Sequence, residues 1–257
     1  AGKSTSLRME LGVMQPDSGS VSLFGKPPGI ATLKRVGFLP EERGLYKKMT
    51  PRSSIEHFAR LKGLSAQDAR ARANELLDTA GLGDFKSTRI SKLSKGLAQR
   101  LRILSTRAHQ PDFLILDEPC SGLDPVNQQV LEDLIRAEHA RGATILFSTH
   151  VMEHAERLCD RVMIMMGGRA ISEGAPRDLI ETHLAREAIE LDCDPRDEAA
   201  LIDGMPGAGL RVRAGDRLMI YADDSSGVVA RVHARDGGDR RPLTVRPTNL
   251  EDVFLSL

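Results

Sequence analysis

Residues 113–124, Phe-Leu-Ile-Leu-Asp-Glu-Pro-Cys-Ser-Gly-Leu-Asp, join a run of apolar residues to two adjacent carboxylates and a turn. Four consecutive apolar residues are typical of a buried parallel strand. In open α/β sheets, ligands bind beyond the carboxyl ends of the strands. We therefore predict that Asp117 and Glu118 lie at a strand end, where they meet a metal ion and a reacting group.

The composition excludes several classes of function. The chain has 257 residues, 40% of them hydrophobic, and 36 basic residues balance 36 acidic ones. Because the basic residues are spread along the chain, we expect no nucleic-acid partner. No apolar run approaches the ~18 residues that span a bilayer. Three cysteines, Cys120, Cys159 and Cys193, share no metal-type spacing, and we interpret them as packing residues in a reducing compartment.

The first residues carry the end of a phosphate-binding pattern. Ala1-Gly2-Lys3-Ser4-Thr5 matches the end of G-x-x-x-x-G-K-[ST], so the first four positions of that pattern would precede Ala1. In such a loop the lysine reaches the β- and γ-phosphates and the hydroxyl binds magnesium. We predict these roles for Lys3 and Ser4. On its own the match also suits a Gly-Lys pair that opens a surface helix.

Elements between this motif and residue 110 are predicted from local signals. Residues 21–24 and 36–40 have the apolar pattern of strands, and the second run ends at Pro40 in a polar loop that begins with Glu41. Thr50 and Pro51 are typical of a helix start, and helical patterns continue to about residue 110, as in an inserted helical subdomain.

The last helix of this region begins beside Ser94. Ser94 is a typical N-cap residue, and leucines follow it at helical spacing. One interpretation is a capped core helix. The other is that Ser94, Lys95 and Gly96 offer N–H groups and a positive charge to an anion.

A second strand that ends in polar residues is predicted at residues 143–147, followed by Ser148-Thr149-His150. His150 and His154 are four residues apart, so we considered a zinc site. We do not favour zinc, because no third ligand has a suitable position.

The end of the chain has a different composition. Residues 161–174 have the pattern of a hairpin, and a helix at 175–184 closes a first domain that we place at residues 1–185. Residues 186–257 then show the order β-α-β-β-α-β, a split βαβ pattern in a small α+β domain.

Together, these motifs resemble the ATP-binding subunit of an ABC transporter, in the branch that serves ABC-2-type exporters with sodium-efflux-like and drug-export-like systems. The resemblance to the family rests on residues 2–5, 93–96, 116–119, 121–124 and His150, and it covers nearly the whole chain. The resemblance to this branch rests on residues 37–46 and 247–254. It implies a P-loop NTPase fold of the α/β class with an inserted helical subdomain at about residues 50–110 and a C-terminal accessory domain.

The resemblance also implies roles for the residues that match it. Lys3 and Ser4 hold phosphates and magnesium, Asp117 supports the metal, Glu118 polarises the attacking water and His150 senses the γ-phosphate. Hydrolysis requires charge neutralisation around the γ-phosphate and an in-line water, which these residue types supply. The resemblance also implies that further residues bind ATP, with Glu41 in addition a magnesium ligand: Gly2, Thr5, Glu41, Ser94, Lys95, Gly96 and Asp124.

The implied partners are ATP, Mg²⁺, a second cassette and an integral membrane permease. The second cassette is another copy of the chain or a close paralogue, and Ser94, Gly96 and Asp124 face it. The permease would hold the subunit at the cytoplasmic, inner face of the cell membrane. Alternatives are a soluble ABC-type ATPase outside transport and an impaired nucleotide-binding scaffold.

Three departures from the family pattern matter. The signature Leu-Ser-Gly-Gly-Gln has become Leu93-Ser94-Lys95-Gly96-Leu97, and Glu41 stands where most cassettes have a metal-linked glutamine. A carboxylate still ligates magnesium. Because the strand and half of the phosphate loop would precede Ala1, we expect that the chain as given binds ATP poorly.

Overall fold

A three-stranded parallel sheet lies at the centre of the first of two units into which the chain divides, residues 2–150 and 151–257. The computed structural model describes residues 2–41, 45–203, 208–235 and 242–257. The strands, in spatial order, are β1 (Val36–Leu39), β2 (Phe113–Asp117) and β3 (Thr144–Ser148). The predicted strand at residues 113–116 is therefore confirmed as the central one, and it extends to Asp117.

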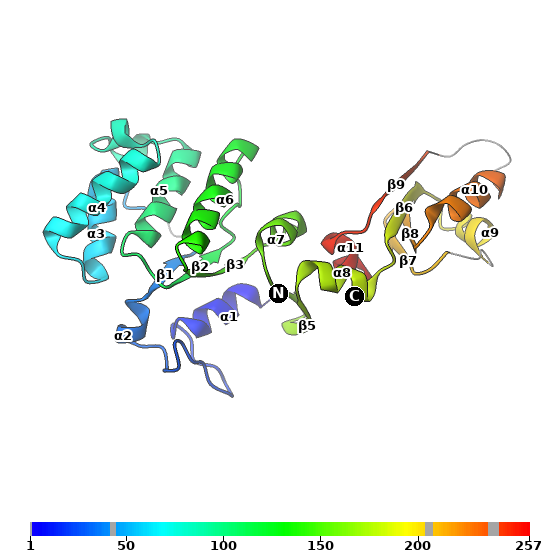
Figure 1. Ribbon diagram of the computed structural model, residues 1–257, viewed down its shortest axis with the longest axis horizontal. Helices are drawn as coiled ribbons and strands as arrows, with labels where there is room; N and C mark the ends of the chain where they lie inside the picture. Colours follow the sequence, from blue (N-terminus) through cyan, green and yellow to red (C-terminus); the bar gives the residue numbers. More distant parts are fainter. Residues whose placement is uncertain (1, 42–44, 204–207, 236–241) are drawn as a thin grey trace. The chain divides into compact units, whose positions relative to one another are not determined.

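Helices cover both faces of this sheet. Helix α1 (Lys3–Glu10) packs Leu7 against Ile115 on one face. Helices α5 (Lys95–Arg107) and α6 (Pro125–Ala140) lie on the other side (Figure 1). At Gly37 a Cβ would lie 2.7 Å from the carbonyl oxygen of Thr106 in α5, so a larger residue there would push the helix off the strand.

The predicted helical subdomain is present. It consists of α3 (Pro51–Leu61), α4 (Ala66–Thr79) and α5, with short 3₁₀ turns at Gly83–Phe85 and Ile90–Lys92. Thr50 accepts a hydrogen bond from the backbone N–H of Ser53 and Pro51 occupies the first helical position, as predicted. The three helices share one apolar core: Ile55, Ala59, Ala69, Ala73, Leu76, Leu77, Leu82, Ile90, Leu101, Leu104 and Ala108.

The strand predicted at residues 21–24 is wrong. Leu23 and Lys26 exchange two backbone hydrogen bonds across a tight turn, and Phe24 and Gly25 between them have φ angles of 54° and 74°. Such angles belong to turns rather than to extended chain. The segment continues to the short helix α2 (Ile30–Leu33).

The second unit begins with α7 (Met152–Leu158) and the antiparallel hairpin of β4 (Val162–Met166) and β5 (Arg169–Gly174), which confirms the hairpin prediction. Helix α8 (Pro176–His183) follows, and the C-terminal helix α11 (Leu250–Ser256) packs with it. The shared core consists of Ala155, Ile164, Leu179, Leu250 and Val253.

The rest of the second unit is an antiparallel sheet with two helices. Its elements in chain order are β6 (Glu187–Asp192), α9 (Glu198–Ile202), β7 (Arg211–Ala214), β8 (Arg217–Ala222), α10 (Ser225–Arg235) and β9 (Leu243–Pro247). The strand order β7-β8-β6-β9 places β8 between β6 and β7. This arrangement is the predicted split βαβ pattern.

The division between the units falls after His150, whereas the sequence suggested residues 1–185 and 186–257. The boundary falls after His150, earlier in the chain than the sequence suggested, because α11 shares a core with α7 and α8. This core joins the end of the chain to elements that precede residue 185. The domain boundary at residues 185 and 186 stays a prediction.

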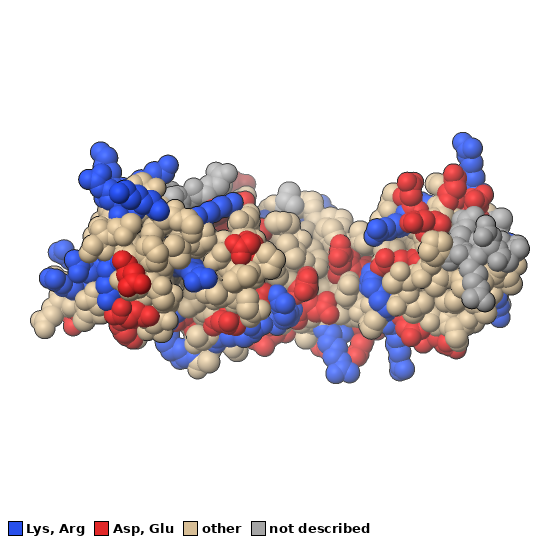
Figure 2. All heavy atoms as spheres, turned by 90° about the horizontal axis from the view of Figure 1, so that it is seen from above, with Lys and Arg blue, Asp and Glu red and all other residues tan. Residues whose placement is uncertain are grey.

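The surface and the helices agree with the mixed composition. Lysine and arginine side chains lie among aspartate and glutamate side chains on the face that Figure 2 shows. In the described ranges, every helix is too short or too polar to cross a bilayer. Cys120 is buried, and Cys159 and Cys193 pack within apolar cores, as predicted.

Candidate functional site

Two neighbouring strands end in side chains that hold each other. Asp117 at the end of β2 is paired in register with Ser148 at the end of β3. The Ser148 hydroxyl donates to Oδ1 of Asp117 over 2.6 Å and accepts the backbone N–H of Glu118 at 3.0 Å. Ser148 therefore orients the Asp117 carboxylate and holds the backbone of Glu118. The sequence predicts Ser148 at a strand end but does not predict this role, which depends on the register of β2 with β3.

The start of α1 brings a lysine and a hydroxyl to these carboxylates. Gly2 precedes the helix with a φ of 105°, a conformation that favours glycine. The ammonium of Lys3 donates to Oε1 of Glu118 over 3.0 Å and to the carbonyl oxygen of Thr149 over 2.7 Å. The Ser4 hydroxyl lies 3.3 Å from Oδ1 of Asp117. The structure thus unites residues that are more than a hundred positions apart.

The predicted histidine also contacts Glu118. Nδ1 of His150 lies 2.8 Å from Oε2 of Glu118. The His150 side chain is 69% exposed and that of Glu118 is 12% exposed, so the histidine faces solvent while the carboxylate lies deeper. Each oxygen of Glu118 therefore has its own partner, Lys3 on one and His150 on the other.

The backbone at Glu118 is strained. Its φ is 47°, in the left-handed region that non-glycine residues rarely adopt. Its N–H binds Ser148 and its carbonyl oxygen accepts the N–H of Ser121 at 3.1 Å. Such strain persists only where surrounding contacts impose it, and it clusters at functional sites.

The predicted anion-binding end of α5 lies against the turn that follows Glu118. The Ser94 side chain accepts the backbone N–H of Leu97 at 3.3 Å, which confirms the predicted N-cap. A Cβ at Gly96 would lie 2.5 Å from the amide of Asn127, and one at Gly122 would lie 2.4 Å from the Lys95 ammonium. Ser94 and Lys95 themselves are exposed.

Asp124 caps the next helix. Its carboxylate accepts the backbone N–H of Asn127 at 3.0 Å and the Asn127 side-chain amide at 2.5 Å. These hydrogen bonds, the side-chain one first, lower the pKa of Asp124 below its ordinary value. Asp124 is exposed, as is Val126 beside it at 70%.

The structure does not bring all predicted residues to one place. No hydrogen bond or ion pair in the described part of the chain joins Ser94, Lys95 or Asp124 to Lys3 or Ser4. Thr5 is exposed on α1, and the Glu41 side chain is exposed after β1. Three residues of the loop that begins at Glu41, numbers 42–44, lie outside the described residues.

The oxygen ligands at the strand ends suit magnesium. Mg²⁺ is usually held by one or two carboxylates together with substrate phosphates and water. Asp117 and Ser4 offer such a set beside each other, and Asp117 is only 6% exposed. Among the described residues, no group of three or more His, Cys, Asp or Glu side chains is placed to hold a metal ion by itself.

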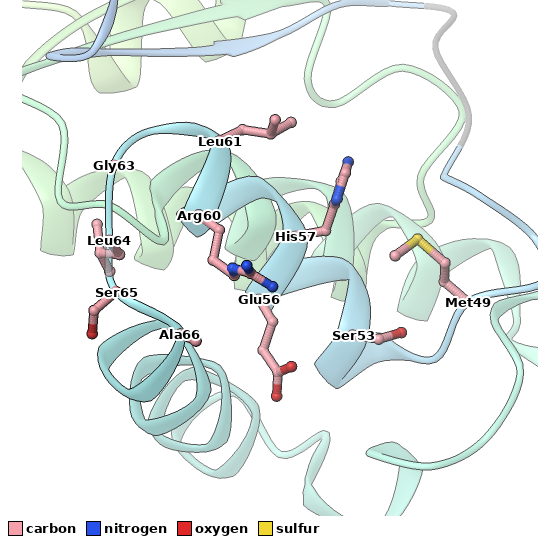
Figure 3. A pocket seen from close by; sticks show the side chains of 10 residues that line it. All are labelled: Met49, Ser53, Glu56, His57, Arg60, Leu61, Gly63, Leu64, Ser65 and Ala66. Carbon is pink, nitrogen blue, oxygen red and sulfur yellow. The ribbon is translucent and has the colours of Figure 1, made fainter.

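A separate cavity of about 820 Å³ lies between α3 and the start of α4 and includes none of the predicted site residues. Figure 3 shows Glu56 and Arg60 of α3 beside this opening, with Ser65 and Ala66 across from them. It belongs to the helical subdomain, and its lining is mixed in character.

Comparisons with known proteins identify related chains. A family model described as ABC transporter matches residues 1–121. The Nod factor export ATP-binding protein I of Burkholderia thailandensis is 42% identical over 264 residues, which cover 100% of this chain and 84% of that protein. The protein of the same name from Rhizobium etli is 38% identical and is covered over 81% of its length.

Solved structures agree with the sequence comparison. An ATP-binding subunit of an ABC transporter superposes with a TM-score of 0.64 and 31% identity, over 70% of this chain and 77% of that one. CbiO1 of Clostridium perfringens, part of the ABC transporter complex CbiONQ, gives a TM-score of 0.62 at 26% identity, over 70% and 74% of the two chains.

Proposed function

This chain belongs to the ATP-binding subunits of ABC transporters, as its motifs predicted, and we propose that it hydrolyses ATP with Mg²⁺ to power export through a separate membrane permease. The observation that carries the proposal is the cluster of Lys3, Ser4, Asp117, Glu118 and His150 at one end of the parallel sheet. The export direction is supported by the relatives, whose names describe export.

Each side chain of the cluster suits one task. The Lys3 ammonium binds phosphate oxygens, and Glu118 is released from it to orient a water and accept its proton. His150, which is exposed and bound to Glu118, would contact the terminal phosphate. Ser4 and Asp117, with Glu41, would hold Mg²⁺, which neutralises phosphate charge when it is bound.

We propose that two cassettes close on ATP. Ser94, Lys95 and Gly96 lie at the N-terminus of a 13-residue helix, where N–H groups favour an anion. They make no direct contact with Lys3 or Ser4 through a described hydrogen bond or ion pair, so a second copy or a close paralogue would supply them. The exposed turn from Ser121 to Val126, with Asp124 as its cap, is the surface that would meet that copy.

Location follows from the partner. A subunit that works with a permease would lie on the cytoplasmic face of the cell membrane. This proposal places no part of the chain in the bilayer, and it includes no nucleic acid. If the chain were instead a soluble ABC-type ATPase, it would bind no permease.

Three measurements test the proposal. Purified full-length protein should release phosphate from ATP only with Mg²⁺, and light scattering should show a dimer when ATP is present and hydrolysis is blocked. The protein should also co-purify from membranes with an integral permease that is encoded beside it. Hydrolysis without any permease partner would favour the soluble ATPase, and absence of hydrolysis would favour the scaffold.

A further inference from the structure

Helix α5 carries two side chains that connect the two loops of the proposed catalytic site. Arg102 donates through Nη1 to Oε1 of Gln99 over 2.7 Å. Its Nη2 donates to the carbonyl oxygens of Pro40 and of Glu41, the latter at 3.2 Å. Gln99 in turn donates through Nε2 to the carbonyl oxygen of Pro119 over 2.9 Å.

This series of hydrogen bonds ends, on each side, next to a residue with a proposed role in hydrolysis. Pro40 and Glu41 follow β1, and Glu41 is a proposed magnesium ligand. Pro119 directly follows Glu118, the proposed base. A single guanidinium and one carboxamide therefore join the loop after β1 to the loop after β2.

The hydrogen bond from Gln99 to Pro119 restrains the backbone next to Glu118. Glu118 has a φ of 47°, and three contacts around it fix this conformation: Ser148 on its N–H, Ser121 on its carbonyl oxygen, and Gln99 on the next carbonyl along the chain. A strained residue relaxes when one of its restraints is removed. Loss of the Gln99 hydrogen bond would therefore let the Glu118 carboxylate turn away from its position.

Arg102 is itself confined. Burial lowers its pKa from the ordinary arginine value, and its guanidinium finds hydrogen-bond acceptors in two backbone carbonyls and one side-chain amide. Guanidinium groups hold several acceptors in a fixed plane, which a flexible lysine does not do. A displacement of Pro40 and Glu41 would therefore shift Arg102, and through it Gln99 and the chain after Glu118.

We propose that Arg102 and Gln99 form a positioning relay that couples the Glu41 loop to Glu118. The relay deepens the ATPase proposal and rests on it. Neither residue touches the reacting atoms. When the Glu41 loop occupies its metal-binding position, Arg102 orients Gln99, and Gln99 holds the backbone that aims Glu118 at the water.

The test uses Gln99→Glu and Arg102→Met in the full-length protein, with kcat, KM for ATP and the Mg²⁺ concentration at half-maximal rate as readouts. Gln99→Glu keeps an acceptor for Arg102 but removes the N–H donor to Pro119. We expect kcat to fall about tenfold with KM and Mg²⁺ dependence unchanged. Arg102→Met should lower kcat by at least as much and should also raise the half-maximal Mg²⁺ concentration about threefold.

The double variant should be no slower than Arg102→Met, because both changes break one relay. The control is Arg107→Met, which removes the ion pair of Arg107 with Glu138 at the other end of α5, 2.8 Å long and mostly buried. It should lower the melting temperature and leave kcat unchanged. The relay would be overturned if Gln99→Glu kept the wild-type kcat, or if the control lost as much kcat as the relay variants. It would also be overturned if the fold-losses in kcat of the two single variants multiplied in the double variant. A wild-type protein without ATPase activity would instead refute the proposed function and the relay with it.

Discussion

A cluster of charged side chains in the first unit and one in the second differ in how their charges are used. At the strand ends of the first unit, Lys3 and Glu118 are paired while the Lys3 side chain stays 36% exposed. In the second unit, Asp252 is fully buried and receives two hydrogen bonds from Arg246, at 2.7 and 2.8 Å. Arg246 also binds Glu190 at 2.6 Å, and the hydroxyl of Tyr221 lies 3.2 Å from Asp252.

The difference is the one expected between a cluster that binds a ligand and a cluster that stabilises the fold. A buried carboxylate whose hydrogen bonds all come from its own chain has no capacity left for a ligand. The first cluster has a half-exposed lysine, an exposed histidine and a strained backbone at Glu118, which are features of a site that exchanges partners. Changes in the first cluster should therefore affect turnover, and changes in the second should affect stability.

The largest effect is expected from Glu118→Gln. The substitution keeps the shape of the side chain but removes the carboxylate that accepts a proton, so kcat should fall about 100-fold or more. The melting temperature should change little, because the pair with Lys3 is partly solvated. Phosphate release at saturating ATP measures the effect. The matched control is Glu181→Gln, which changes an exposed glutamate paired with Arg177. Turnover within twofold of the wild type in Glu118→Gln would remove Glu118 from the role of base.

The next effect is on stability, in Asp252→Asn. The variant is isosteric, but among the described residues it leaves the Arg246 guanidinium with Glu190 as its one carboxylate partner. Breaking a buried pair by removing one charge costs about 3–5 kcal/mol, and the 28% exposure of the Arg246 side chain reduces our expectation to about 2–4 kcal/mol.

Urea unfolding of Asp252→Asn checks this value, and kcat per folded molecule should equal that of the wild type. The control is Asp203→Asn, in which the lost partner is the exposed Arg211, and it should cost less than about 0.5 kcal/mol. Equal costs in the two variants would contradict the distinction drawn between buried and surface pairs.

Ser148→Ala should give a smaller loss of turnover. The hydroxyl joins Asp117 to the N–H of Glu118, and the loss of such hydrogen bonds is worth about 1 kcal/mol, or about fivefold in kcat. The Mg²⁺ concentration at half-maximal rate should also rise, because Asp117 loses the hydrogen bond that orients it. Ser105→Ala is the control, since Ser105 is 3% exposed and its hydroxyl has no hydrogen-bond partner within the described ranges. A loss of kcat in both variants would point to packing rather than to orientation.

Asp117, Glu118 and His150 of the proposed site could be predicted because they follow strands, whereas Lys3 and Ser4 were predicted from the phosphate-loop pattern. The apolar runs before Asp117 and before Ser148 locate two parallel strand ends, and such ends meet at one edge of a sheet. The φ of Glu118 and the hydrogen bonds of Arg102 were not predictable, because both depend on how α5 approaches the two loops. The Asp252 cluster was also missed, since it joins β6, β8 and β9 to α11 through side chains with no motif.

The smallest effect should come from Tyr221→Phe, which tests whether the buried cluster is held by its arginine. Burial, with the nearby charge of Asp252, raises the pKa of Tyr221 well above its ordinary value, so its hydroxyl stays a donor at all working pH values. The ring is fully buried, and phenylalanine fills the same space. The hydroxyl makes one hydrogen bond to Asp252, whereas Arg246 makes two. Its removal should therefore cost about 0.5–1.5 kcal/mol in urea unfolding, less than Asp252→Asn, with no change in kcat. A loss as large as that of Asp252→Asn would mean that the tyrosine, rather than the arginine, neutralises the cost of burying the carboxylate.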